Sequence, residues 1–531
     1  MTKNWASSAA SSLLDRAAEL LSRKAYRDAH ALCMQAIQQA PNDARIYYLL
    51  GILTGDHANH AKAIELFDRA LALGPARADI LAQKARNEIV LLKRDAAVKS
   101  ADAAAALCPT DAFTLDTLGV VYSRAGLHGR ATGFYEAATT AAPGVSAYWY
   151  NLGVARQFSG AMEGARKAFR TCIDRDPSEV RALAALVQIT RQTPDDNHVT
   201  ELEDIFPRVQ QDPDEALRIG HALAKAHEDM NDPARAMRWL ARAKAGKWAS
   251  VNHKTAFDGA IFAAAMVNDG VSAQDGHADA APIFIVGMPR TGTTLVDRIL
   301  SGHSAVTSAG ELADFGLSLK QLVGTPSNYV LDADTLEAAR RVNPGELGRT
   351  YMERVRATLG LTGRFIDKMP LNAVYAPIIL SALPNARVIC LRRHPADTVL
   401  SNYRQMFSTR YPYYDYALNL EAAARYYVGF DRMIRHFSDT LPRDRFTQVH
   451  YENIVQDIEG ETRRLLAFCD LPFEEDCVAF HKNAAPVATA SSAQVRQPLY
   501  TSALARWKRY EAELAPALSI LREAACLPEA D

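Results

Sequence analysis

The chain lacks an excess of charge of either sign. Over 531 residues the formal net charge is -1, so no overall field draws the molecule to nucleic acid or to an anionic membrane. It also lacks the run of about 18 apolar residues that a membrane-spanning helix needs. Charged side chains interrupt residues 1–24, unlike the apolar stretch of a signal peptide. The sequence therefore predicts no nucleic-acid partner and no membrane span.

Paired cysteines are also missing. There are seven cysteines, an odd number, and no two form a C-x-x-C pair. This pattern argues against a disulfide framework and a zinc site, and it favours a reducing compartment. We therefore expect a cytoplasmic protein without a bound metal. Its length and its 48% hydrophobic composition predict several globular domains.

The first part of the chain has a strict internal period. A proline recurs every 34 residues, at Pro41, Pro75, Pro109, Pro143 and Pro177. Glycines lie on the same grid, at Gly51, Gly119 and Gly153. Twelve positions after each of these glycines lies a small residue. Four residues after that small residue lies a larger one, which is Phe67, Tyr135 or Phe169. Small residues let two helices approach closely and larger ones fill the gap, which predicts tandem helical hairpins.

This pattern resembles the tetratricopeptide repeat. We expect repeats over residues 1–180, then a degenerate repeat and helical connector over 181–280, and a separate domain over 281–531. The repeats could dock a protein partner in their groove, or they could act as a rigid shoulder for the neighbouring domain. A repeat fold alone does not decide between the two.

A strand, a glycine-rich turn and a helix follow from residue 282. The apolar run Ile283–Val286 leads into Gly287, and the spacing from Gly287 to Gly292 fits the G-x-x-x-x-G frame of a phosphate-binding P-loop. Thr293 stands where an ATPase or kinase needs lysine, and Arg290 within the loop supplies a cation instead.

A second apolar run, 387–391, ends in Arg392 and Arg393 before another helical pattern. Because ligands bind beyond the carboxyl ends of parallel strands, these arginines are expected near the first loop. Ser401 follows Arg393 by eight residues, and a guanidinium with a hydroxyl suits a second phosphate group that ATP does not possess. Strands are also expected at 364–367 and 446–450, leading into Lys368 and Tyr451.

These two motifs resemble the 5′- and 3′-phosphate sites of sulfotransferases that use 3′-phosphoadenosine 5′-phosphosulfate (PAPS). The resemblance covers about residues 282–516, and the arginine in the loop is closest to the tyrosylprotein and carbohydrate branches. It implies PAPS as co-substrate. The residues that it implies for nucleotide binding are Arg290, Thr291, Gly292, Thr293, Thr294, Arg393, Ser401, Tyr451 and Arg496. Ala505 stands where relatives often have glycine.

Sulfuryl transfer needs a base for the acceptor and a cation at the departing phosphate. By the same resemblance Glu311 is the catalytic base, and Lys368 and Arg290 are the catalytic cations. His303 is the second candidate for the base. The tyrosine-rich segment 411–416 could be a lid over the acceptor, or it could pack the repeats against the catalytic domain.

The predicted fold is an all-α tetratricopeptide solenoid followed by an α/β P-loop-type domain with a parallel sheet. The predicted function is transfer of a sulfuryl group from PAPS to a hydroxyl or amine of a peptide, carbohydrate or small molecule. A P-loop kinase or nucleotidase is the first alternative, and a non-catalytic repeat adaptor is the second.

Overall fold

The computed structural model divides into two compact units, Met1–Thr190 and Arg191–Asp531. It describes residues 9–91, 93–251, 255–268, 275–279, 282–327, 329–361, 363–409, 411–482 and 503–527. Each unit is described by itself. The predicted limits at 180/181 and 280/281 remain a prediction.

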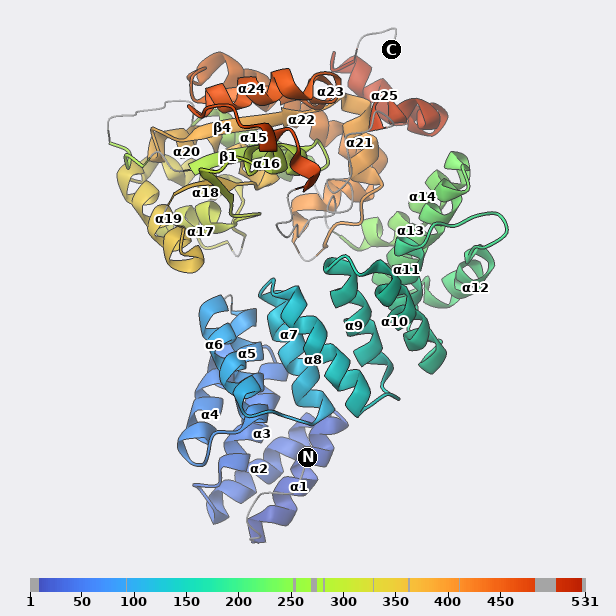
Figure 1. The fold of residues 1–531 in the computed structure, drawn as a ribbon, viewed down its shortest axis with the longest axis vertical. Helices are drawn as coiled ribbons and strands as arrows, with labels where there is room; N and C mark the ends of the chain where they lie inside the picture. Colours follow the sequence, from blue (N-terminus) through green and yellow to red (C-terminus); the bar gives the residue numbers. More distant parts are fainter. Residues whose placement is uncertain are drawn as a thin grey trace. The chain divides into compact units, whose positions relative to one another are not determined.

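The first unit is a series of helical hairpins (Figure 1). Its helices are α1 (Ala9–Ser22), α2 (Tyr26–Gln39), α3 (Ala44–Asp56), α4 (His60–Ala72), α5 (Ala78–Val90), α6 (Arg94–Ala106), α7 (Ala112–Arg124), α8 (His128–Ala141), α9 (Ser146–Phe158), α10 (Met162–Arg175) and α11 (Val180–Ile189). A β-carbon added to Gly119 would lie 2.6 Å from the Tyr135 ring. Gly51 faces Phe67 and Gly153 faces Phe169 in the same way. The predicted pairing of a small with an aromatic residue is confirmed in these three hairpins.

The second unit contains a five-stranded parallel sheet with helices around it (Figure 1). Its strands are β1 (Pro282–Gly287), β2 (Val306–Ser308), β3 (Arg364–Asp367), β4 (Arg387–Arg392) and β5 (Phe446–His450), in the order β2-β3-β1-β4-β5. Its α-helices are α12 (Val199–Val209), α13 (Pro213–Asp229), α14 (Pro233–Ser250), α15 (Thr255–Met266), α16 (Thr293–Leu300), α17 (Asp314–Val323), α18 (Ala333–Ala338), α19 (Pro344–Leu359), α20 (Ala376–Ala382), α21 (Pro395–Tyr403), α22 (Leu420–Thr440), α23 (Tyr451–Gln456), α24 (Ile458–Phe468) and α25 (Glu511–Glu523). Short 3-10 helices are η1 (Ala339–Arg341), η2 (Pro370–Tyr375), η3 (Pro412–Leu418), η4 (Glu475–Cys477), η5 (Phe480–Lys482) and η8 (Arg506–Tyr510).

Both faces of the sheet are buried, as continuous apolar strands predict. Along β1, Ile283 and Ile285 pack into one core, while Phe284 and Val286 pack into the other. The fold class predicted from the sequence is therefore confirmed. The four strands predicted from apolar runs are present, and the three-residue strand β2 is the one that the sequence reasoning missed.

Within the described ranges no helix is long and apolar enough to cross a membrane. In the same ranges no group of three or more His, Cys, Asp or Glu residues is arranged to hold a metal ion.

Candidate functional site

The loop between β1 and α16 has a backbone shaped for an anion. Arg290 (φ 68°) and Gly292 (φ 106°) both adopt left-handed conformations before α16 begins at Thr293. The Thr291 hydroxyl donates to the Met288 carbonyl at 2.7 Å and closes the turn. Successive backbone N–H groups at such a turn, followed by a helix N-terminus, form a concavity that favours negative charge.

A neighbouring strand and a neighbouring helix approach this loop so closely that only glycine fits at two positions. A β-carbon on Gly287 (φ 144°) would lie 2.7 Å from the Leu391 carbonyl oxygen of β4. One on Gly292 would lie 2.7 Å from the ring of Tyr451, the first residue of α23. The two glycines of the P-loop frame are thus explained by sterics as well as by backbone conformation. Thr293 and Thr294 begin α16 and are buried.

Arg393 lies beside the loop, as predicted. Its guanidinium donates to the Arg290 carbonyl at 3.3 Å and to the Ala503 carbonyl at 2.6 Å. It also lies over the Tyr451 ring, 5.0 Å from the centroid. Ser401 is half-buried on α21, and no hydrogen bond joins it to Arg393 in the described structure. The fold therefore brings Arg290, Arg393 and Tyr451 together at the carboxyl ends of β1, β4 and β5.

Lys368 and Glu311 form an ion pair at the end of β3. The Lys368 side chain is 1% exposed, whereas that of Glu311 is 43% exposed. The Lys368 amide also donates to the Gly310 carbonyl at 2.9 Å, which joins the two segments through the backbone. Glu311 precedes α17 and is not part of that helix. A buried ammonium thus holds a carboxylate that remains accessible to a substrate.

Two buried carboxyl groups accompany this pair, and the sequence reasoning assigned neither of them a role in the site. Burial raises the pKa of Asp297. A hydrogen bond with Ser308 and the charge of Lys368 act in the opposite direction and lower it. Burial also raises the pKa of Asp367 to about 8, and the Tyr351 hydroxyl donates to this carboxyl group at 3.0 Å. Asp367 is the last residue of β3, directly before Lys368, and this strand-end position was the available signal.

His303, the second candidate for the base, has a different environment. It is 4% exposed, its Nδ1 accepts a hydrogen bond from the Ala305 amide at 3.0 Å, and its Nε2 lies 3.3 Å from Glu474. These contacts link the end of α16 to the chain around residue 474. Glu311 is the more accessible of the two candidates.

Asn402 is a further residue that the sequence reasoning missed. Its amide donates to the Pro289 carbonyl of the loop at 2.8 Å and accepts from the Tyr416 hydroxyl at 3.0 Å. Nearby, Tyr414 stacks on Phe407, with ring centroids 4.5 Å apart. Burial raises the pKa of Tyr414, and the charge of Glu311 adds to this effect. The tyrosine-rich segment thus lies beside the candidate base and is tied to the P-loop.

The C-terminal segment returns to the start of α21. The Trp507 amide donates to Asp397 at 2.9 Å, and the Trp507 ring stacks on His394. Ala505 has a left-handed backbone (φ 49°), which explains why glycine suits this position. Arg496, predicted to contact the nucleotide, lies outside the described residues.

Residues 282–475 match the sulfotransferase family and residues 146–179 match the tetratricopeptide repeat. An uncharacterized protein of Aquifex aeolicus is 34% identical over 254 residues, which cover 47% of this chain and 33% of that protein. A protein-tyrosine sulfotransferase of Drosophila melanogaster is 26% identical over 258 residues, covering 45% of this chain and 51% of that protein. The chain thus spans a third to a half of the length of these relatives.

Among solved structures, the sulfotransferase domain of the Synechococcus PCC 7002 olefin synthase aligns with 48% of this chain and 98% of its own, at 19% identity and a TM-score of 0.34. The family predicted from the two phosphate-site motifs is confirmed for residues 282–475, which form a sulfotransferase-family domain. The predicted tetratricopeptide repeats are confirmed as well.

Proposed function

We propose that the sulfotransferase-family domain transfers a sulfuryl group from PAPS to a hydroxyl or amine acceptor. The observation that carries this proposal is the contact of the Arg393 guanidinium with the Arg290 carbonyl, at 3.3 Å. It sets a second cation beside a loop already shaped for an anion. ATP offers phosphates to one such site only, whereas PAPS carries a 5′-phosphosulfate and a separate 3′-phosphate.

The proposed donor contacts divide between two elements. The loop residues Arg290, Thr291 and Gly292, with Thr293 and Thr294 at the start of α16, would hold the 5′-phosphosulfate through backbone N–H groups, hydroxyls and the guanidinium. Arg393 and Ser401 would hold the 3′-phosphate, and Tyr451 would form a wall beside Gly292. Arg496 stays a proposed nucleotide contact.

In the proposed reaction Glu311 takes the proton of the acceptor hydroxyl. The acceptor oxygen forms a bond to sulfur, and the bond between sulfur and the bridging phosphate oxygen breaks. The electron pair leaves with 3′,5′-adenosine bisphosphate. Lys368 would move from Glu311 toward that bridging oxygen as negative charge develops there, and Arg290 would stabilise the same charge.

Calorimetric titration with 3′,5′-adenosine bisphosphate, ADP and ATP tests the donor class. We expect the bisphosphate to bind most tightly, and Arg393→Ala to weaken it about 10- to 100-fold, the cost of losing charge-assisted hydrogen bonds. Arg432→Ala, which removes an exposed arginine of α22, is the matched control. Equal or tighter binding of ATP, or binding that Arg393→Ala leaves unchanged, would contradict the proposal.

The same titration separates the two other functions. A kinase or nucleotidase would prefer ATP, although Thr293 replaces the lysine that such enzymes use. A non-catalytic adaptor would bind none of the three nucleotides.

The tetratricopeptide repeats are proposed to dock a protein partner or the acceptor itself. The acceptor class stays open among peptide, carbohydrate and small molecule. A cytoplasmic location remains a prediction from the cysteine pattern.

A further inference from the structure

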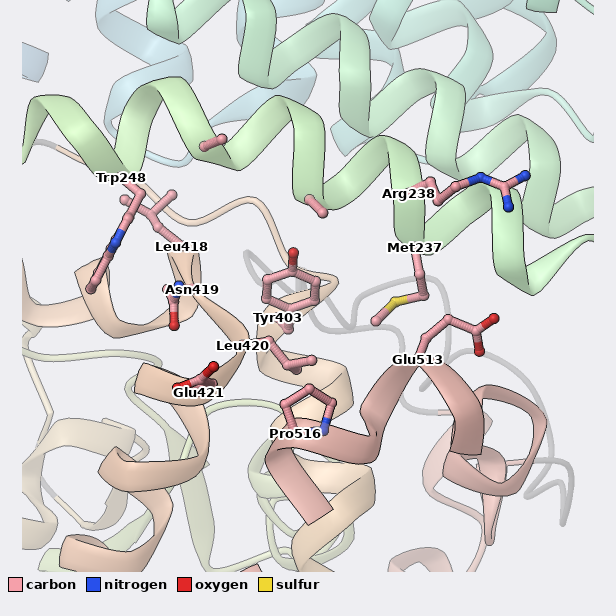
Figure 2. Close-up of a pocket in the computed structure, with 12 residues that line it drawn as sticks. Met237, Arg238, Trp248, Tyr403, Leu418, Asn419, Leu420, Glu421, Glu513 and Pro516 are labelled. Atoms are coloured by element: carbon pink, nitrogen blue, oxygen red, sulfur yellow. The ribbon is translucent and has the colours of Figure 1, made fainter. Parts of the chain in front are cut away.

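The unit Arg191–Asp531 contains a cavity outside the set of residues proposed for the donor site. It has a volume of about 480 Å³ and opens between α14 and the helices α21, α22 and α25 (Figure 2). Its lining residues are Met237, Arg238, Ala241, Ala245, Trp248, Tyr403, Leu418, Asn419, Leu420, Glu421, Glu513 and Pro516. None of the residues proposed for donor binding or proton transfer is among them. A cavity of this size suits one small molecule.

The walls of this cavity are largely apolar. Met237, Trp248 and Pro516 supply a thioether, an indole and a pyrrolidine, and two alanines of α14 leave room between them. Arg238 and Glu513 lie at one end, and Glu421 lies below α14 toward the other (Figure 2). Glu421 forms an ion pair with Arg425 at 2.9 Å. The remaining charges, on Arg238 and Glu513, balance each other, so the cavity favours a ligand with no net charge.

Tyr403 gives the cavity a directed polar group. The side chain is 4% exposed, and its hydroxyl points toward α14 across the middle of the cavity (Figure 2). Within the described residues this hydroxyl makes no hydrogen bond. Burial raises the pKa of Tyr403 to about 12, so the phenol keeps its proton at neutral pH and remains a donor. Because this hydroxyl faces the open cavity, it can donate a hydrogen bond to an acceptor on a ligand in place of water.

We infer that this cavity binds an uncharged, largely apolar small molecule whose hydrogen-bond acceptor, such as a ketone carbonyl oxygen, receives the Tyr403 hydroxyl. The apolar body would lie against Met237, Trp248 and Pro516. This inference does not rest on the proposed sulfuryl transfer, since the cavity shares no residue with the donor site.

Benzophenone is a suitable probe because it is uncharged, carries one carbonyl oxygen and couples covalently to nearby C–H bonds under ultraviolet light. Irradiation of the full chain with benzophenone, followed by peptide mass spectrometry, should give saturable adducts on cavity residues, with Met237 foremost. An excess of 3′,5′-adenosine bisphosphate should not reduce them.

Two variants and a matched control make the test specific. Ala241→Trp fills the cavity and should abolish the adducts, whereas Ala249→Trp, on the same helix but outside the lining, should leave them unchanged. Tyr403→Phe keeps the ring and removes the donor, so the benzophenone concentration giving half-maximal labelling should rise about 2- to 10-fold. Labelling retained by Ala241→Trp, an unchanged half-maximal concentration for Tyr403→Phe, adducts mapped elsewhere, or displacement by the bisphosphate would overturn the inference.

Discussion

Replacing Lys244 with methionine is expected to stabilise the protein at neutral pH. Lys244 is 2% exposed, and its ammonium donates to the Ala417 carbonyl at 2.9 Å and the Gln405 carbonyl at 3.3 Å. No carboxylate pairs with it among the described residues. Burial lowers its pKa from 10.5 to about 7. Methionine has a similar length and carries no charge to bury.

The magnitude follows from this pKa difference. The unfolded chain binds the proton more readily than the folded one, so the penalty is fully present below pH 7 and disappears as the pH rises toward 10.5. It amounts to about 4 kcal/mol at pH 7 and about 1 kcal/mol at pH 10. Leaving two carbonyl groups without the lysine costs the variant about 2 kcal/mol. Lys244→Met should therefore be more stable than wild type by about 2 kcal/mol at pH 7 and less stable by about 1 kcal/mol at pH 10.

Urea unfolding of the two proteins, followed by tryptophan fluorescence between pH 7 and pH 10, measures this difference. Groups that titrate in both proteins cancel when the two are compared at each pH. Lys508→Met, which removes an exposed lysine of η8, should show no such dependence. A wild-type-minus-variant difference that stays constant from pH 7 to pH 10 would refute the reasoning.

Three further changes have defined outcomes. Glu311→Gln should lower turnover with any acceptor that wild type uses by about 10²- to 10⁴-fold, without weakening bisphosphate binding in calorimetry, whereas Glu337→Gln on α18 should do neither. Gly119→Ala should destabilise the repeats by about 1–2 kcal/mol in thermal unfolding, because its β-carbon would lie 2.6 Å from Tyr135; Gly133→Ala, with nothing within 4 Å, should stabilise them slightly. Ala505→Gly should raise the free energy of unfolding by about 0.5–1 kcal/mol by relieving its left-handed backbone, while Ala524→Gly, at φ -87°, should not.

Features set by local spacing were predictable from the sequence. The 34-residue period gave the helical hairpins and the pairing of Gly153 with Phe169, because both depend on positions within one repeat. The P-loop frame and the arginine after β4 were predictable for a similar reason, since parallel strands end at a common edge. The strand β2 was not, because three residues, Val306–Ser308, carry too little periodicity to distinguish a strand from a turn.

Contacts between distant segments were not predictable. Asn402 is 113 residues from Pro289, and Lys244 is 173 residues from Ala417. No local sequence pattern identifies an asparagine that hydrogen-bonds to a P-loop, or a lysine that is buried without a carboxylate partner. Tyr403 is similar: its place in a helical pattern was evident, but the cavity around its hydroxyl exists only once α14 and α25 are in place.

The hairpin α13–α14 combines a repeat-like sequence with contacts to the segments around the proposed donor site. Its small residues follow the repeat pattern, yet the hairpin lies in the unit that contains the sheet. Glu228 of α13 bonds with Arg404, with the Tyr510 hydroxyl and, at 2.7 Å, with Arg506. Burial alone would raise the pKa of Glu228, but the charges of these two arginines hold it below its ordinary value. Since Arg404 directly follows α21 and Arg506 begins η8, one repeat-like helix fixes two segments beside the proposed 3′-phosphate site.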